Sequence, residues 1–162
     1  MAKNKEEKTN VMRVLEQKKI AYTAHTYPHE EGVAVDGVTV AKSMGFDPAI
    51  VFKTLVARGA SKQYYVFDVP VAENLDLKKA AKAVGEKSIE MIHQKELLPL
   101  TGYVHGGCSP VGMKKLFPTV FHETAENLET MIVSAGKIGY QVELSPHDLA
   151  ALVRAKFADL IV

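Results

Sequence analysis

Residues 50–69 read Ile-Val-Phe-Lys-Thr-Leu-Val-Ala-Arg-Gly-Ala-Ser-Lys-Gln-Tyr-Tyr-Val-Phe-Asp-Val, and they carry the strongest β-sheet signal in the chain. Two runs rich in β-branched and aromatic side chains, 50–57 and 63–69, are separated by a short polar segment that contains Gly59. This pattern is typical of two antiparallel strands joined by a longer hairpin loop. We therefore expect the fold to be built around this hairpin.

Outside the hairpin, strand patterns alternate with short helical patterns. Further strands are predicted at 21–27, 88–92, 118–122, 130–134 and 139–144, and helices at 9–19, 38–44, 76–85 and 145–153. Hairpin-length links occur beside helical connections, which favours a mixed sheet over a purely parallel one. The sequence predicts a mixed α/β fold: a single compact domain over residues 1–162, in which a mixed β-sheet is flanked by short helices.

Composition excludes several classes of protein. The chain has 162 residues, of which 47% are hydrophobic, and a formal net charge of +1, so any contact with nucleic acid or a membrane must be local. The longest stretch without Asp, Glu, Lys or Arg, 97–113, contains prolines and glycines that do not suit a membrane-spanning helix. Residues 1–10 are charged and lack the apolar core of a secretory signal. We expect no membrane association and a cytoplasmic location.

The chain also lacks the motifs of the common enzyme classes. There is no Gly-x-Ser-x-Gly elbow, no His-Glu-x-x-His pair and no Gly-x-Gly-x-x-Gly turn. Residues 107–112 have the glycine spacing of a phosphate loop, but Met113 and Lys114 follow them and Pro110 removes an amide donor. The six histidines are scattered, and a lone cysteine can form no internal disulfide. We expect no metal and no cofactor.

Lys53 interrupts an apolar strand, so it lies either on a solvated face or in a cleft where an ammonium group has a task. The loop 102–112 is a second candidate, because Gly106 and Gly107 let backbone approach a ligand closely. The amides of residues 107–109 could then donate to an oxyanion, although an ordinary tight turn explains the same glycines.

Cys108 lies three residues after His105, which permits a cysteine nucleophile with a histidine base. The alternative is a small thiol packed in a loop. Three lysines, Lys78, Lys79 and Lys82, lie on adjoining faces of the predicted helix over 76–85. They form either a solvated helix face or, if Lys53 shares their side, a surface for a phosphodiester substrate.

Several of these segments together resemble one family. The segments are Phe52-Lys-Thr-Leu55, the 74–85 stretch that ends at Gly85, Thr101-Gly-Tyr103, Gly106-Gly-Cys-Ser-Pro110 and Lys114-Lys115. In this order and spacing they resemble the YbaK/EbsC group of aminoacyl-tRNA deacylases, which clear Cys-tRNA(Pro) and are related to the editing domain of bacterial prolyl-tRNA synthetases. The similarity runs over nearly the whole chain, and no single motif is specific.

The resemblance implies a trans-editing deacylase that removes cysteine from mischarged tRNA(Pro). In that family the substrate's own thiol is thought to attack the ester, so no protein nucleophile is needed. Lys53 matches the family's essential lysine, Tyr27 matches a tyrosine near the pocket, and residues Gly106, Gly107, Cys108, Ser109 and Pro110 match the Gly-x-x-x-Pro loop that holds the substrate end. Lys78, Lys79 and Lys82 would then contact tRNA phosphates.

The resemblance has one departure and leaves alternatives open. Ile138 and Gln141 stand where the family pattern has an arginine and an acidic residue. A deacylase for Ala-tRNA(Pro), a non-catalytic module that binds tRNA or prolyl-tRNA synthetase, and a hydrolase dependent on Cys108 are the alternatives to the proposed activity. Prolyl-tRNA synthetase is also the expected protein partner of an active enzyme.

Overall fold

The computed structural model describes residues 8–162. In chain order its elements are α1 (Asn10–Gln17), β2 (Thr23–Thr26), α2 (Gly37–Met44), the 3-10 turn η1 (Pro48–Ile50), β3 (Phe52–Gly59), β4 (Tyr64–Pro70), α3 (Leu77–Val84), β5 (Ile89–Met91), α4 (Gln94–Thr101), β6 (Thr119–His122), the 3-10 turn η2 (Glu123–Asn127), β7 (Met131–Ser134), β8 (Tyr140–Leu144), α5 (Pro146–Val153) and β9 (Lys156–Ala158).

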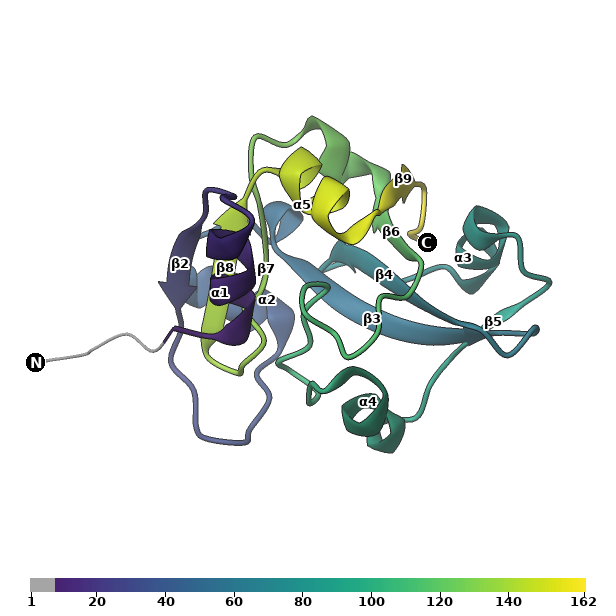
Figure 1. Ribbon diagram of the computed structural model, residues 1–162, viewed down its shortest axis with the longest axis horizontal. Coiled ribbons are helices and arrows are strands. Elements are labelled where there is room, and N and C mark those ends of the chain that lie inside the picture. The colour runs from purple at the N-terminus through teal and green to yellow at the C-terminus, as the bar shows by residue number, and fades with distance from the viewer. Residues whose placement is uncertain (1–7) are drawn as a thin grey trace, which may run out of the picture.

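The strands form two sheets rather than the one expected from the sequence (Figure 1). The larger has the order β5-β3-β4-β6-β9 and is mixed, because β4–β6 and β6–β9 pair in parallel and the other pairs are antiparallel. The smaller has the order β2-β8-β7 and is antiparallel throughout. Within residues 8–162, an isolated parallel bridge joins Val51, the residue between η1 and β3, to Ile132 of β7 in the smaller sheet. The mixed α/β class is confirmed.

The hairpin predicted at 50–69 is the centre of the larger sheet. In β4 the side chains alternate between two cores: Val66 packs in the core shared with the smaller sheet, α1 and α5, whereas Phe67 and Val69 pack in a second core against α3. A strand with buried side chains on both faces appears in sequence as a continuous apolar run, which is why this signal was strong.

Helix boundaries follow local sequence. The side chains of Asp36 and Asp76 accept backbone amides at the starts of α2 and α3, and Gly45 and Gly85 end these helices with φ of 79° and 73°. The helix α4 was not predicted, because Pro99 lies inside it; its start is stabilised by Glu96, whose carboxylate accepts the His93 amide at 2.9 Å. The strand β9 was also missed, since three residues are too few for a pattern.

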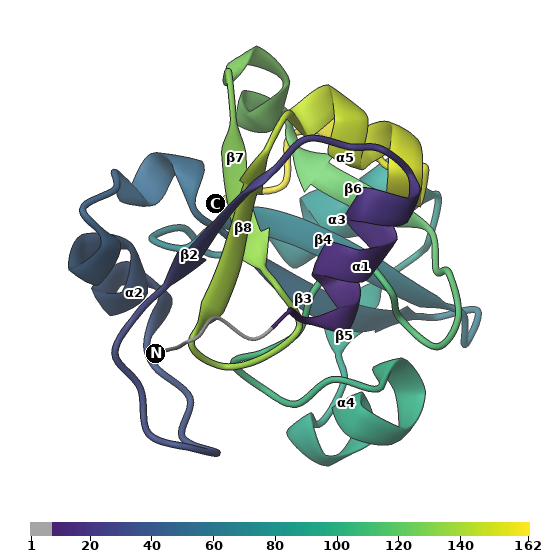
Figure 2. The ribbon, with the colours of Figure 1, turned by 60° about the vertical axis from the view of Figure 1, so that its left-hand side comes forward.

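Figure 2 shows how the smaller sheet is placed between helices. The strands β2, β8 and β7 run side by side, with α2 on one side of them and α1 on the other. In Figure 1 the helix α3 lies beside β5, at the opposite end of the molecule from α2. Among residues 8–162, no helix is long and apolar enough to span a membrane.

Candidate functional site

A cavity of about 360 Å³ lies where the two sheets meet, between the start of β3, the N-terminal part of α2 and the loop that follows α4. Four of the residues predicted for the site line it: Tyr27, Lys53, Gly106 and Cys108. These four come from three segments that are far apart in the sequence. The volume is within the range of small-molecule sites.

One wall of the cavity is an unpaired edge of β3. The amide of Val71 donates to Val51 O at 2.8 Å and that of Gly59 to Gln63 O at 2.8 Å, so the odd-numbered residues of β3 direct their backbone groups toward β4. The backbone groups of Phe52 and Thr54 therefore point away from β4. The neighbouring strand β5 pairs with the far end of β3, from Ala57 to Gly59. The strand β7 meets the start of this edge through the bridge from Val51 to Ile132, and within the described residues no strand pairs with the edge at 53–55.

Lys53 is the cation of this cavity wall. The side chain is partly buried, and burial lowers the pKa of its ammonium group, while the carboxylates of Asp36 and Glu73 act in the opposite direction. Over residues 8–162, the Lys53 ammonium makes no hydrogen bond or ion pair. Of the two interpretations of Lys53, the structure favours the one that places it in a cleft, because an unpaired and partly desolvated cation faces a cavity.

Gly106 and Gly107 allow two chain segments to pass close together. Gly106 has a φ of 91°, and a Cβ atom on it would lie 2.7 Å from the Ala34 Cβ. A Cβ on Gly107 would lie 3.1 Å from the backbone nitrogen of Ile138. The first distance is too short for a side chain and the second is tighter than most Cβ contacts, so these glycines let the loop pack closely against the segments before α2 and between β7 and β8.

The loop offers fewer backbone donors than its sequence suggested. The Gly107 amide donates to Val104 O at 3.0 Å within a turn, so it is not available to an oxyanion. The amides of Cys108 and Ser109 have no acceptor among residues 8–162. Ser109 is fully buried, and its Oγ accepts the Val111 amide at 3.3 Å. Pro110 lines a separate, smaller cavity. Gly106 and Cys108 thus reach the main cavity, whereas Gly107, Ser109 and Pro110 shape the loop behind it.

A buried carboxyl group lies behind the cavity wall. Asp68 is fully buried in β4, opposite Thr54 of β3, and the Thr54 hydroxyl donates to Asp68 Oδ1 at 2.5 Å. The other oxygen, Oδ2, has no hydrogen-bond partner within the described part of the chain. Burial raises the pKa of Asp68 to about 7, and the Thr54 hydrogen bond offsets part of this. Burial also raises the pKa of Cys108 to about 12, and the charge of Asp68 adds to that rise.

Sequence reasoning did not single out Thr54 or Asp68. The sequence did contain a signal for Asp68: it is an aspartate within an apolar strand that is buried on both faces. A carboxyl group is seldom buried without a hydrogen-bond or charge partner. Gln141 and Ser134 also line the cavity, and Gln141 Oε1 is buried without a partner in residues 8–162. Gln141 is the position already noted as departing from the family pattern.

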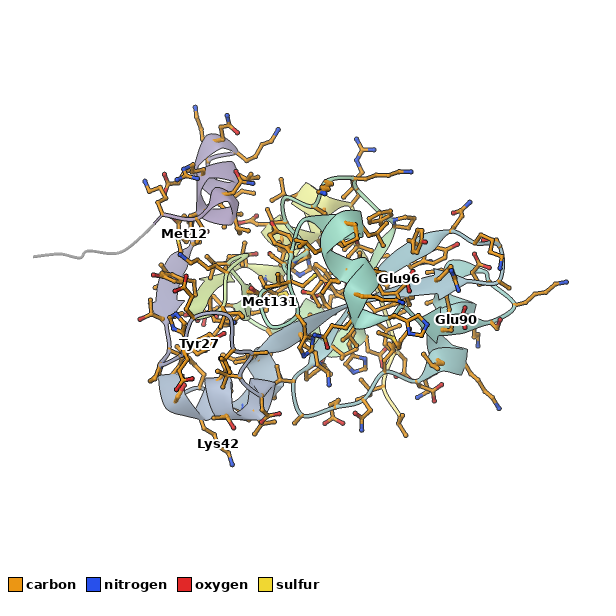
Figure 3. All side chains as sticks on the ribbon, turned by 90° about the horizontal axis from the view of Figure 1, so that it is seen from below. Met12, Tyr27, Lys42, Glu90, Glu96 and Met131 are labelled. Atoms are coloured by element: carbon orange, nitrogen blue, oxygen red, sulfur yellow. The ribbon has the colours of Figure 1, made fainter. Side chains whose placement is uncertain are left out.

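Tyr27 anchors the end of β2 to this region. It is 4% exposed, its amide donates to Gly139 O at 3.0 Å, and its ring packs edge-on to His29. Figure 3 shows Tyr27 on the same side of the molecule as Lys42 of α2, and far from Glu90 of β5.

The three lysines of α3 do not line the cavity. The ammonium of Lys79 donates to Asp159 Oδ2 at 2.9 Å and to Ile161 O at 2.8 Å, which fastens α3 to the C-terminal segment. Lys78 and Lys82 are exposed. The helix α3 packs beside β5, toward the far end of β3, so these lysines are not part of the cavity lining. A role for Lys78 and Lys82 in binding a more distant part of a long ligand stays a prediction.

Across residues 8–162, no group of three His, Cys, Asp or Glu side chains could hold a metal ion.

Residues 32–152 match the model of the aminoacyl-tRNA editing domain. The chain belongs to this family. It is 45% identical over 161 residues, 99% of this chain and 98% of the relative, to a protein of Enterococcus faecalis named provisionally as Cys-tRNA(Pro)/Cys-tRNA(Cys) deacylase EbsC. A crystal structure described provisionally as a trans-editing enzyme for prolyl-tRNA synthetase matches with a TM-score of 0.79 and 26% identity over 94% of both chains. A scaffold protein from work on epitope backbone grafting matches with a TM-score of 0.81 and 25% identity, again over 94% of both chains.

Proposed function

We propose that this editing-domain protein is a trans-acting deacylase that removes cysteine from mischarged tRNA(Pro). The observation that carries the proposal is the unpaired ammonium of Lys53 in a cavity that belongs to an aminoacyl-tRNA editing domain. Its relative of 45% identity is named for the same reaction. Charged tRNA is made and used in the cytoplasm, where we place the protein.

The chemistry that suits this cavity is attack by the substrate's own thiol. The sulfur forms a bond to the ester carbonyl carbon while the bond to the ribose oxygen breaks; the thiol proton passes to solvent and the ribose oxygen takes up a proton. Water then opens the resulting thioester and releases cysteine. The protein has to hold the ester in a reactive geometry and stabilise the oxyanion that develops on the carbonyl.

Lys53 is the group best placed to stabilise that oxyanion. A cation in a partly desolvated cavity interacts more strongly with a developing negative charge than one in water. The amides of Cys108 and Ser109, which lack acceptors in the described chain, are the backbone donors that remain in the loop. Neither contribution requires a protein nucleophile, in keeping with the high pKa of Cys108.

The test is the loss of ester from purified substrates. Cys-, Ala-, Ser- and Pro-charged tRNA(Pro), together with Cys-tRNA(Cys), are incubated separately with the protein, and acid-precipitable label is followed. We expect Cys-tRNA(Pro) to be deacylated in preference to Pro-tRNA(Pro). Equal turnover of both, or turnover of neither, would contradict the proposal; turnover of Ala-tRNA(Pro) alone would support the alternative substrate.

Prolyl-tRNA synthetase is the proposed partner, because a structural relative is described as a trans-editing enzyme for that synthetase. A deacylase that acts after release has to reach mischarged tRNA before it enters translation, and association with the synthetase would shorten that path. Sedimentation of the two proteins with and without tRNA(Pro) tests the association. A purely binding module would associate in the same way and leave every ester intact.

A further inference from the structure

A cluster of three aromatic rings, those of Tyr27, His29 and Tyr140, lies beside the cavity. Tyr27 lines the cavity, whereas His29 and Tyr140 do not. The His29 ring packs edge-on to both tyrosines, with its centre 6.1 Å from each of theirs. Tyr140 is held there by the pairing of β2 with β8, which places it opposite Thr26 (Figure 2). His29 therefore lies one ring contact outside the cavity.

The His29 ring is exposed, yet its position is fixed by the residues around it. Its Nδ1–H donates to Tyr27 O at 3.0 Å, because a carbonyl oxygen can only accept. Gly139, with a φ of 98°, leaves the space for the ring, since a Cβ on this residue would overlap it. A ring held in this way loses little conformational entropy when another ring stacks on it.

The loop that carries Lys137 connects the aromatic cluster to the glycine loop of the cavity. A Cβ on Gly107 would lie 3.3 Å from Lys137 Cα, and the Lys137 ammonium lies 5.4 Å from the centre of the Tyr140 ring. The surroundings are not uniformly basic, because two exposed glutamates follow His29 at positions 30 and 31. Two carboxylates disfavour a site made for phosphates alone, whereas a ring face binds a flat base without a net charge.

We propose that His29 is the platform on which the penultimate nucleobase of the 3′ end of a charged tRNA stacks. The proposal rests on the proposed deacylase function and adds a contact with the RNA to it. The terminal nucleoside carries the ester, so its ribose has to lie at the cavity that contains Lys53. The preceding nucleotide then lies outside the cavity, where His29 is the ring next to Tyr27. Stacking on a ring tolerates any base, which suits a 3′ end that all tRNAs share.

Equilibrium binding of two uncharged RNA hairpins tests the platform. Both hairpins carry the acceptor stem of tRNA(Pro) with its single-stranded 3′ end and a fluorescein in the loop, and in one of them the penultimate nucleotide lacks its base. Fluorescence anisotropy gives the ratio of the Kd of the abasic hairpin to the Kd of the complete hairpin. Both values come from the same protein sample, so the ratio is insensitive to partial unfolding of a variant. We expect a ratio of roughly ten for the unaltered protein, the usual effect of one stacked base.

Two substitutions at His29 separate stacking from other roles of the side chain. His29→Ala removes the ring and should bring the ratio close to one. His29→Phe keeps a flat ring but loses the hydrogen bond to Tyr27 O, and it should keep most of the ratio. A ratio close to one in His29→Phe as well would mean that the imidazole acts through a polar contact, which contradicts the platform.

A matched control is His147 in α5. Its exposed ring packs on Phe157 with centres 5.7 Å apart and makes a hydrogen bond with Glu126 O at 3.1 Å, and it does not line the cavity. His147→Ala should keep the ratio of the unaltered protein. The inference is wrong if the unaltered protein binds neither hairpin, binds both equally, or keeps its ratio in His29→Ala.

Deacylation of Cys-tRNA(Pro) by the unaltered protein is measured separately, so the two proposals can fail independently. Turnover together with a ratio of one overturns the platform and leaves the proposed function standing. A ratio of roughly ten that His29→Ala abolishes, without any turnover, overturns the proposed function and supports His29 as a surface for a nucleobase.

Discussion

The thiol of Cys108 lies close enough to the buried Asp68 carboxyl for the charge of Asp68 to act on it, and no cation among residues 8–162 is a cause of its pKa shift. Burial and Asp68 together raise its pKa to about 12. Reactive cysteines have the opposite environment, in which a nearby histidine, lysine or helix N-terminus lowers the pKa and produces a thiolate. His105 also lines the cavity, but it is not among the groups that shift the Cys108 pKa. The hydrolase dependent on Cys108 is thus disfavoured.

Cys108→Ser should therefore retain most of the activity on Cys-tRNA(Pro). Serine keeps the backbone amide and nearly the volume of cysteine, and the attacking sulfur belongs to the substrate. The measurement is the deacylation rate of the variant, accompanied by the rate of the unaltered protein on Ser-tRNA(Pro). An inactive but folded variant, together with equal rates on Ser and Cys substrates, would instead indicate that Cys108 is the nucleophile, because a hydroxyl is much less reactive than a thiol at neutral pH.

Lys53→Ala should lower kcat on Cys-tRNA(Pro) by about 10²–10³, the usual effect of removing one donor to an oxyanion. Thermal stability should change little, because the ammonium makes no hydrogen bond or ion pair within residues 8–162. The matched control is Lys42→Ala, which removes an exposed lysine on the same side of the molecule as Tyr27 and should keep full activity. If the Lys53→Ala variant has the melting temperature and the deacylation rate of the unaltered protein, Lys53 is a solvated strand residue without a catalytic role.

The sequence was sufficient for the frame of the fold and insufficient for the details of the site. The hairpin at 50–69 and the helix ended by Gly85 were predictable, because a buried run and a capped helix are local patterns. The separation of the strands into two sheets depends on which strands pair with one another over long sequence distances, which is a tertiary property. Similarly, Lys53 could be recognised as unusual, but whether it faced solvent or a cleft depended on which distant segments of the chain pack around the start of β3.

The glycine loop shows the same limit at the level of single atoms. The glycines predicted that another group approaches the loop backbone closely. In the structure the approaching groups are Ala34 and Ile138, which are distant in sequence and could not be identified in advance. The engaged Gly107 amide could not be foreseen, because its acceptor is a turn carbonyl chosen by the loop conformation. The sequence showed that Asp68 belongs to an apolar strand. Its hydrogen-bond partner could not be predicted, because Thr54 becomes its neighbour only through the pairing of β3 with β4.

The exposed lysines of α3 can still contribute to tRNA affinity. We expect the double variant Lys78→Gln, Lys82→Gln to flatten the dependence of log K on log salt by roughly 1.5, the value for two lost phosphate contacts. Lys79→Gln is a separate variant, because its ammonium already binds Asp159 and Ile161 and its loss should affect stability as well. Filter binding of tRNA(Pro) at several salt concentrations gives the slope. An unchanged slope in the double variant would assign both lysines to a solvated helix face.

Asp68 also makes a definite prediction about stability against pH. In the unfolded chain an aspartate has its ordinary pKa of 3.8, whereas burial raises the pKa of Asp68 in the folded protein to about 7. Between these values the folded protein binds more protons than the unfolded chain, so this group lowers the free energy of unfolding as pH rises. The raised pKa lowers the free energy of unfolding by about 4 kcal/mol. This loss of stability is complete above pH 7 and absent below about pH 4.

Asp68→Asn removes this penalty and keeps the oxygen that accepts from Thr54. The free energy of unfolding of the variant minus that of the unaltered protein should therefore increase steadily from pH 4 to pH 8, by up to about 4 kcal/mol. Urea unfolding at four pH values measures it, and the difference cancels most contributions from other groups. Asp159→Asn is the control of opposite sign, because the hydrogen bond from Lys79 lowers the pKa of Asp159, and its loss should cost stability at neutral pH. A difference for Asp68→Asn that does not change with pH would mean that the buried carboxyl is not the strained group that its burial and its unpartnered oxygen indicate.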